Sequence, residues 1–160
     1  RAALVIAHRW LGLLIAAFLL ISGLAGAVIG WDHELDEWLN PHLFNAQSTL
    51  PAQEPMALAE QLEARDPRLL VSYLPLHVEP GHNLQLGVVP RKDANGVLPT
   101  LDFDQVMLDP GSGEVAGQRL WGEMSLSRES IMAFLYKLHY SLHIPDAFNL
   151  PVGMLLLGMV

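Results

Sequence analysis

The sequence has no cysteine and few basic residues, and both absences restrict what the protein can do. Without cysteine, disulfide bonds, thiolate nucleophiles and Cys-ligated zinc or iron–sulfur centres are excluded. Lysine and arginine number nine against seventeen aspartates and glutamates, which gives a net charge of −8. Nucleic acid needs clustered basic side chains to face its phosphates, and the chain has no such cluster. Nucleic acid is therefore not an expected partner.

Hydrophobic residues, by contrast, make up 51% of the 160 residues, and the mean hydropathy is +0.30. Both values are typical of a membrane-attached protein with one modest soluble domain. No charged side chain occurs from Trp10 through Trp31, a stretch that can cross about 30 Å of hydrocarbon at ~1.5 Å per residue. We predict a transmembrane helix over residues 1–30. It exceeds the ~7 to 15 apolar residues of a signal peptide, so we expect an uncleaved anchor.

Charge asymmetry predicts the orientation of this helix. Arg1 and Arg9 precede the apolar run, and no further lysine or arginine occurs until Arg65. The positive-inside rule then places the N-terminus in the cytoplasm and the segment from Trp31 on outside. Residues 31–130 carry sixteen of the seventeen acidic side chains and six basic ones. We expect this segment to be the soluble domain, on the outer side of the membrane.

A second apolar run closes the sequence. Residues 147–160 read as the start of a second transmembrane helix, but Leu150 to Val160 supplies only eleven residues, about half a span. We expect a longer protein in which that helix continues, because Arg1 is also not an initiator methionine.

Residues 31–130 have the pattern of a small α+β domain. A short helix is expected from Trp31 until Pro41, and a second one over residues 54–67 between two prolines. Four strand-like runs follow, separated by Gly, Pro and Asn, at residues 69–78, 83–90, 104–109 and 114–121. The run DPGSGE at 109–114 is typical of a tight turn. The order predicts an antiparallel meander packed with a helix.

Four motifs in order suggest a family. They are HRWLGL at the first span, WDHELDEWLNPHL after it, MLDPGSGEV in the predicted hairpin and LHYSLH before the second apolar run. The chain resembles the PepSY-associated transmembrane family, the iron-regulated inner-membrane proteins that include siderophore reductases. The resemblance implies a membrane α-helical bundle with an α+β PepSY-like periplasmic domain. In the reductase members it also implies b-type haem carried between helices.

His139 and His143 are the first candidate haem ligands. They are four residues apart in an amphipathic interfacial helix expected over residues 131–146, and would lie on one face of it. A zinc pair would need a third ligand, which the segment lacks. Axial ligands approach a haem from opposite faces, so one iron cannot take both histidines. Either each pairs with another helix, or one ligates and the other supports it. Alternatively, both are only the polar flank of the helix.

His8 is the second candidate, at the cytoplasmic end of the first span. At ~100° per residue, Gly12 and Gly26 point in nearly the same direction as His8. A histidine above a glycine-lined groove suits a flat macrocycle or a close neighbouring helix. The alternative is that Ser22, Gly26 and Gly30 form a small-residue seam for helix packing, with His8 as an interfacial polar residue. On this pattern His8 would serve an inner haem some 35 Å from the outer pair, estimated from the helical rise.

The resemblance and the histidines together predict a haem-containing inner-membrane reductase, with haem b as the cofactor and two haems in all. His8, His139 and His143 are the expected iron ligands, and Gly12 and Gly26 are expected beside the cofactor. Electrons would pass from quinone or a cytoplasmic reductant to a periplasmic ferric siderophore, with membrane lipid as the surrounding partner. The protein would then be a haem-dependent ferric-siderophore oxidoreductase without a protein nucleophile. The alternative is a membrane-tethered PepSY module that binds or regulates without redox chemistry.

Overall fold

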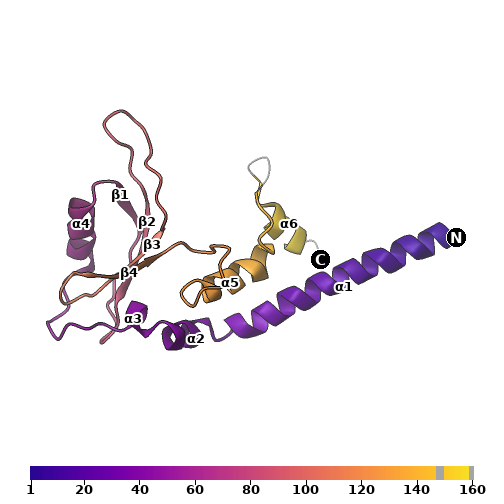
Figure 1. Cartoon of the computed structure of the whole chain (residues 1–160), viewed down its shortest axis with the longest axis horizontal. Helices are drawn as coiled ribbons and strands as arrows, with labels where there is room; N and C mark the ends of the chain where they lie inside the picture. Colours follow the sequence, from indigo (N-terminus) through magenta and orange to yellow (C-terminus); the bar gives the residue numbers. More distant parts are fainter. Residues whose placement is uncertain (147–149, 159–160) are drawn as a thin grey trace. The chain divides into compact units, whose positions relative to one another are not determined.

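The computed structural model describes residues 1–146 and 150–158, and the chain divides into two compact units (Figure 1). The helical unit comprises Arg1–His33, Gly122–Ser127 and Ile131–Val160. The sheet unit comprises Glu34–Trp121 and Arg128–Ser130. Each unit is built from segments that are distant in the sequence, so each depends on contacts between those segments.

Helix α1, Ala2–Ile29, dominates the helical unit. Its 28 residues would extend about 42 Å at ~1.5 Å per residue, more than the ~30 Å of a hydrocarbon layer. Most of its leucine, isoleucine and valine side chains are exposed, and only Ser22 and Ala25 are buried. Lipid is the solvent that suits such a surface. By length and composition α1 fits the predicted first span, and the protein is a membrane protein.

Two short helices follow α1, and proline separates them. Helix α2 covers Asp32–Leu39 and helix α3 covers Pro41–Phe44. Proline has no N–H for the helical hydrogen bond that would continue α2, but it is well tolerated in the first turn of α3. The prediction that Pro41 ends the first helix is therefore confirmed, and Pro41 also begins the next one.

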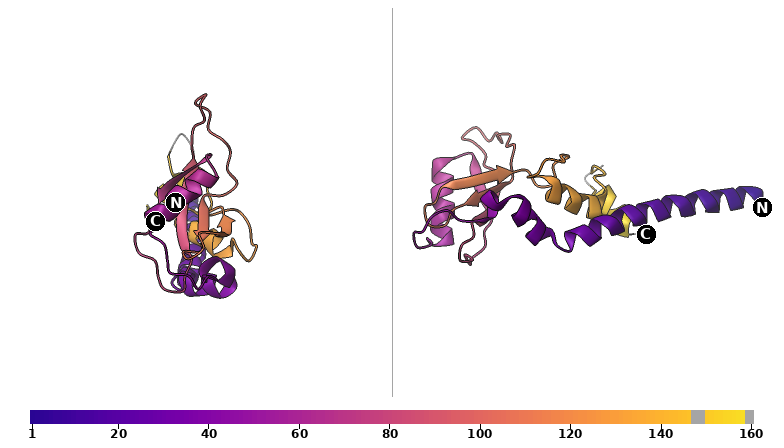
Figure 2. Two further views of the ribbon diagram at one scale, coloured as in Figure 1. Left: turned by 90° about the vertical axis from the view of Figure 1, so that its left-hand side faces the viewer. Right: turned by 60° about the horizontal axis from the view of Figure 1, so that its bottom comes forward.

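The sheet unit contains the predicted antiparallel meander. Its strands are β1 (Leu69–Tyr73), β2 (Leu84–Pro90), β3 (Gln105–Leu108) and β4 (Val115–Arg119), in the spatial order β1-β2-β3-β4. Each strand pairs with its sequence neighbour, and helix α4, Pro55–Arg65, packs against one face (Figure 2). The prediction of a helix and four antiparallel strands in this region is confirmed.

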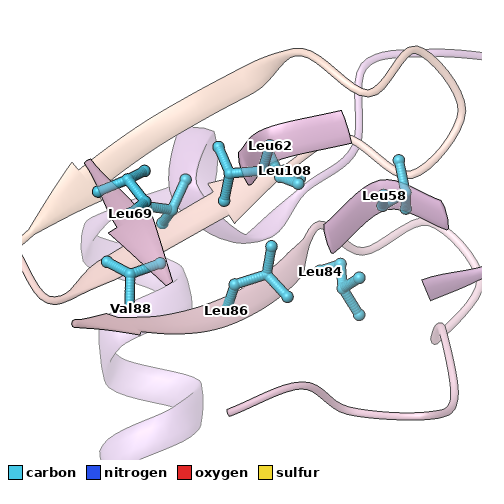
Figure 3. Packing of buried hydrophobic residues seen from close by; sticks show 8 residues of the cluster. Leu58, Leu62, Leu69, Leu84, Leu86, Val88 and Leu108 are labelled. Atoms are coloured by element: carbon cyan, nitrogen blue, oxygen red, sulfur yellow. The ribbon is translucent and has the colours of Figure 1, made fainter. Parts of the chain in front are cut away.

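Alternating residues on the strands build the core beneath α4. Leu84, Leu86 and Val88 on β2 are buried, as the period of two along a strand requires. Leu58 and Leu62 of α4 cover them from above (Figure 3). The same cluster includes Leu69, Val106 and Leu108. Full burial of each such side chain contributes roughly 1.5–3 kcal/mol, so this cluster is the main source of stability in the sheet unit.

The turn between β3 and β4 is held by one carboxylate. Oδ1 of Asp109 accepts hydrogen bonds from the backbone N–H groups of Gly111 (2.9 Å) and Ser112 (3.0 Å). Oδ2 accepts from the N–H groups of Gln47 (2.8 Å) and Ser48 (2.7 Å). Asp109 is 6% exposed, so it ties the predicted tight turn to the segment after α3 from inside the unit.

The helical unit is completed by helix α5, Ile131–Ser141, and helix α6, Val152–Gly158. Helix α5 lies beside the last third of α1 (Figures 1 and 2). It is shorter than the helix expected over residues 131–146, because Leu142 and His143 adopt positive φ angles of 50° and 54°. Pro145 disfavours helical geometry at the residue before it, and the chain leaves the helix ahead of that point.

The predicted second span does not appear as a helix of spanning length. Helix α6 has seven residues, whereas about twenty are needed to cross a bilayer. In the part of the chain that the structure describes, α1 is the one helix long and apolar enough to span. Residues 147–149 and 159–160 of the predicted second segment lie outside the described residues.

Candidate functional site

His139 is held against α1 by two specific contacts. Its Nδ1 lies 2.9 Å from the carbonyl oxygen of Ser22, which can only accept, so Nδ1–H donates. The Ser22 hydroxyl donates in return to the carbonyl oxygen of His139 at 3.1 Å. One turn further along α1, the ring packs on Gly26, where an added Cβ would lie 2.8 Å from Cε1. Gly26 is therefore required for the ring to sit at this place.

The hydrogen bond to Ser22 fixes which nitrogen of His139 is left to coordinate. In a neutral imidazole with the proton on Nδ1, Nε2 carries the lone pair. Histidines that bind metals in proteins commonly donate their other ring N–H to a backbone carbonyl, which orients the ring and raises its basicity. His139 has the same kind of hydrogen bond through Nδ1, and Nε2 is the ring nitrogen that keeps its lone pair.

His143 lies in a different environment, and the prediction that it shares a helix face with His139 is wrong. Because its φ is 54°, it lies beyond the end of α5 instead of one turn further along it. Its Nε2 is 2.9 Å from the carbonyl oxygen of Phe134, and the two rings stack with centroids 4.4 Å apart. The nitrogen that would most readily reach an iron is therefore engaged with the backbone.

His8 and Gly12 lie on the exposed first half of α1. No described heavy atom lies within 4 Å of where a Cβ at Gly12 would stand. The structure brings Gly26 to a histidine but leaves Gly12 open, so the two glycines do not share one partner. His8 is fourteen residues from Ser22, or about 21 Å along the helix. This separation is shorter than the expected 35 Å, because α5 packs beside the span and not beyond its end.

A cavity of about 570 Å³ lies on another side of α5. Its polar lining consists of Lys137, Tyr140, His143 and Asp146, together with Ser141. Its apolar lining consists of Met124, Ile144, Pro145, Pro151 and Met154. At ~100° per residue Lys137 and Ser141 point about 160° away from His139. His139 and His143 therefore serve two different places, one against α1 and one in the cavity.

In the sheet unit the buried charges pair with one another. Nη1 of Arg119 lies 2.6 Å from Oδ2 of Asp36, and the two side chains are 5% and 7% exposed. Arg119 also donates to Gln105, and its guanidinium lies 5.9 Å and 5.7 Å from the ring centroids of Phe44 and Trp121. With Nε and Nη1 both engaged inside the unit, Arg119 has the contacts of a structural residue.

The groove between α4 and β1 borders an edge strand whose backbone is partly occupied by side chains. Its volume is about 290 Å³, and β1 is an edge strand of the sheet. Glu63 of α4 accepts a hydrogen bond from the N–H of Val71 (2.8 Å), while Nε of Arg91 donates to the carbonyl of Leu69 (3.0 Å). Arg91 and Glu63 are themselves paired. Side chains thus occupy backbone groups that an added strand would need.

Over residues 1–146 and 150–158, no three side chains of the His, Asp and Glu types gather closely enough to hold a bare metal ion. The candidate chemistry of the described residues is therefore that of single histidines. The sequence placed Ser22 in a possible packing seam with Gly26 but did not pair it with His139, and it did not indicate Phe134 as the partner of His143. Ser22 and Gly26 are four residues apart, a small-residue spacing that favours close helix packing. That spacing was the available signal, whereas nothing local marks Phe134.

The sequence from residue 5 to residue 160 matches the model of one protein family, the PepSY-associated TM region. No curated protein matches the chain.

Proposed function

Because the chain belongs to the PepSY-associated transmembrane family, we propose that it is an inner-membrane haem protein that delivers electrons to a ferric siderophore in the periplasm. The early positive charges at Arg1 and Arg9 support a cytoplasmic N-terminus. The sheet unit then faces the periplasm, where a bulky ferric complex can approach. The reaction is an oxidoreduction and needs no protein nucleophile.

The observation that carries the proposal is the geometry of His139. A ring held by a backbone carbonyl through Nδ1, and seated on a glycine that leaves no room for a Cβ, is oriented before any ligand arrives. This arrangement fits an axial histidine of a haem, since Nε2 keeps its lone pair. In our proposal His139 holds the outer haem and His143 does not.

His8 holds the inner haem in the same proposal. It lies near the cytoplasmic end of α1 on an exposed surface, where another helix of the bundle can bring the second axial ligand. Intramembrane and interfacial histidines are uncommon and usually functional. Gly12, with open space above it, leaves room for a flat group beside this helix.

The protein's own residues orient and shield, and a bound haem supplies the one-electron chemistry between ferric and ferrous iron. Ser22 fixes the tautomer and the direction of the His139 ring. Gly26 sets how closely α5 approaches α1. The mostly exposed apolar surface of α1 keeps the helix in lipid and away from bulk water. Each of these roles is a property of the resting protein, so each can be tested without measuring electron transfer.

The test compares two single variants of the full protein in lipid nanodiscs. His139→Ala should lower the haem content or leave five-coordinate iron with an altered Soret band and a shifted potential. His143→Ala is the matched control, since it removes the same kind of side chain two residues beyond α5. It should keep the haem spectrum of the wild type.

Reduction of a ferric hydroxamate in a stopped-flow experiment then tests the direction of electron flow. His139→Ala should lose this reduction even where the inner haem can still be reduced by dithionite. A colourless wild-type protein would reject the proposal in favour of a membrane-tethered PepSY binding module. Full haem content in His139→Ala together with loss in His143→Ala would instead reassign the outer ligand.

A further inference from the structure

The cavity beside α5 has the chemistry of a site for a lipid-soluble ring. Its volume of about 570 Å³ lies within the ~300–1,000 Å³ typical of small-molecule sites. Half of its lining residues are apolar, and two of these are methionines, Met124 and Met154. Methionine side chains adapt their shape and make favourable contacts with aromatic rings. The lining thus favours a flat, apolar body in the interior.

The polar groups at the cavity are balanced in charge and in hydrogen bonding. Lys137 and Asp146 carry opposite charges, so their sum is zero and a polyanion gains no net attraction. Lys137 and the Tyr140 hydroxyl can donate, while the Asp146 carboxylate accepts. His143 adds a second acceptor, because Nε2–H donates to Phe134 and leaves the Nδ1 lone pair. The fitting ligand is uncharged and has oxygen atoms that both accept and donate.

Two features indicate that the side chains of Lys137 and His143 are held in position at the cavity by their own contacts. The stem of Lys137 packs on Gly122, which has a φ of 67° and where a Cβ would collide with the lysine side chain. His143 keeps a positive φ, a conformation that costs of order 1 kcal/mol for a residue with a side chain. The stack on Phe134 and the hydrogen bond to its carbonyl maintain that conformation.

We propose that this cavity binds a quinone or quinol of the membrane. A quinone ring presents two carbonyl oxygens to Lys137 and Tyr140, and a quinol presents two hydroxyls to His143 and Asp146. The isoprenoid chain of such a molecule lies in the lipid that also surrounds α1. The opposite charges of Lys137 and Asp146 cancel, so the cavity offers no net attraction to an anionic headgroup.

The role of this ligand rests on the proposed function, whereas its binding does not. A quinol that is oxidised here gives up two electrons and two protons and becomes a quinone. The electrons reduce two ferric ions of the siderophore substrate to ferrous ions, one electron each. Asp146 and Nδ1 of His143 accept the two protons. The cavity and His139 are separated only by the thickness of α5, about 10 Å.

Binding is tested on the full protein in phosphatidylcholine nanodiscs with a decyl-chain benzoquinone and its azido derivative. Calorimetry gives the affinity, and photolabelling with mass spectrometry gives the position. The label should fall on Met124, Tyr140 or Met154. Lys137→Met should weaken binding of the quinone about tenfold or more, because it removes a charged donor to a quinone carbonyl. Asp146→Asn should weaken binding of the reduced form, the decyl-chain quinol, by a similar factor, because it removes the carboxylate that accepts from a quinol hydroxyl. Lys92→Met and Asp102→Asn make the same changes at exposed positions of the sheet unit and should leave the affinity unchanged.

The outcomes separate this proposal from the haem proposal. Haem content is measured on the same samples and should be unaffected by Lys137→Met and Asp146→Asn. A colourless protein that still binds the quinone at the cavity would reject the haem proposal and keep this one. Equal affinity in all variants, or labelling elsewhere, would overturn the site. Displacement of the quinone by phosphatidylglycerol, lost in Lys137→Met, would also overturn it and identify a headgroup site.

Discussion

In the sheet unit, the buried side chains of Asp36, Arg119 and Asp109 are bonded within the unit, whereas in the helical unit His139 and His143 each bond through only one ring nitrogen. Asp36 and Arg119 form an ion pair, and Asp109 uses both carboxylate oxygens on backbone N–H groups of its own unit. His139 and His143 each give one ring nitrogen to a backbone carbonyl and keep the other. Both regions bury polar groups, but Asp109 uses both of its carboxylate oxygens in hydrogen bonds, whereas each of these two histidines uses one of its two ring nitrogens.

The number of polar atoms that a residue leaves unbonded separates structural residues from candidate functional ones, whatever the residue type. A buried polar group whose donors and acceptors are all hydrogen-bonded stabilises the fold and makes it rigid. A group that is oriented by one bond and keeps a coordinating atom is prepared for a ligand. On this criterion Asp36, Arg119 and Asp109 of the sheet unit are structural residues. In our proposal, His139 of the helical unit is the residue that coordinates.

Removing one member of the buried ion pair should have the largest effect on stability. Asp36→Ala leaves the Arg119 guanidinium buried without its counter-charge and also removes the acceptor of Asn40 Nδ2 (2.8 Å). The expected loss is about 3–5 kcal/mol in the free energy of unfolding of the sheet unit. Denaturant unfolding followed by tryptophan fluorescence measures it, since Trp121 lies beside Arg119.

The double variant Asp36→Ala/Arg119→Met is the control for this prediction. It removes both charges, so it should recover a large part of the loss. Haem content should stay at the wild-type value in every variant that remains folded. A double variant no more stable than Asp36→Ala would show that packing, and not charge, accounts for the effect.

The second effect, of intermediate size, concerns pH. Burial raises the pKa of the Asp109 carboxyl, but the backbone N–H groups of Ser112, Ser48, Gln47 and Gly111 more than offset it, so the pKa lies below its usual value. A lowered pKa in the folded state means that the contribution is complete above the unfolded pKa of ~3.9 and is lost as pH falls further. The sheet unit should therefore lose stability below about pH 4.

Asp109→Asn tests this assignment directly. At neutral pH it should cost about 1–3 kcal/mol, because an amide has one accepting oxygen and leaves backbone donors unsatisfied. Below pH 4 the difference from the wild type should shrink, since the protonated carboxyl has lost the same bonds. Asp102→Asn, at an exposed position, should reproduce the wild-type pH profile. Parallel profiles for wild type and Asp109→Asn would assign the acid sensitivity to another group.

The sequence predicted the sheet unit better than the helical unit, for a physical reason. Strand period, proline positions and the DPGSGE turn are local signals, and they gave four strands and the end of α2 correctly. The approach of α5 to α1 joins residues 117 positions apart, through Ser22 and His139. The spacing of Ser22 and Gly26 marks a packing face on α1 but does not say which helix packs there. The same-face prediction for His143 failed because helical spacing does not reveal where a helix stops.

Glycine substitutions on α1 should have the smallest effect on stability and sharpen the comparison most. Gly26→Ala puts a Cβ about where Cε1 and Nδ1 of His139 lie, at 2.8 Å and 3.0 Å, so the ring must move and its bond to Ser22 is lost. Gly23→Ala, three residues away, meets no described atom within 4 Å. The expected cost for Gly26→Ala is about 1 kcal/mol, the net value of one hydrogen bond. Gly23→Ala should be neutral or slightly stabilising, because alanine favours a helix over glycine.

Nitrogen NMR of the His139 ring provides the readout, with Nδ1 protonated in the wild type and in Gly23→Ala but exchanging between tautomers in Gly26→Ala. If both variants keep the Nδ1–H signal, the reserve atom of His139 is not set by contact with α1, and the contrast between the two units does not hold.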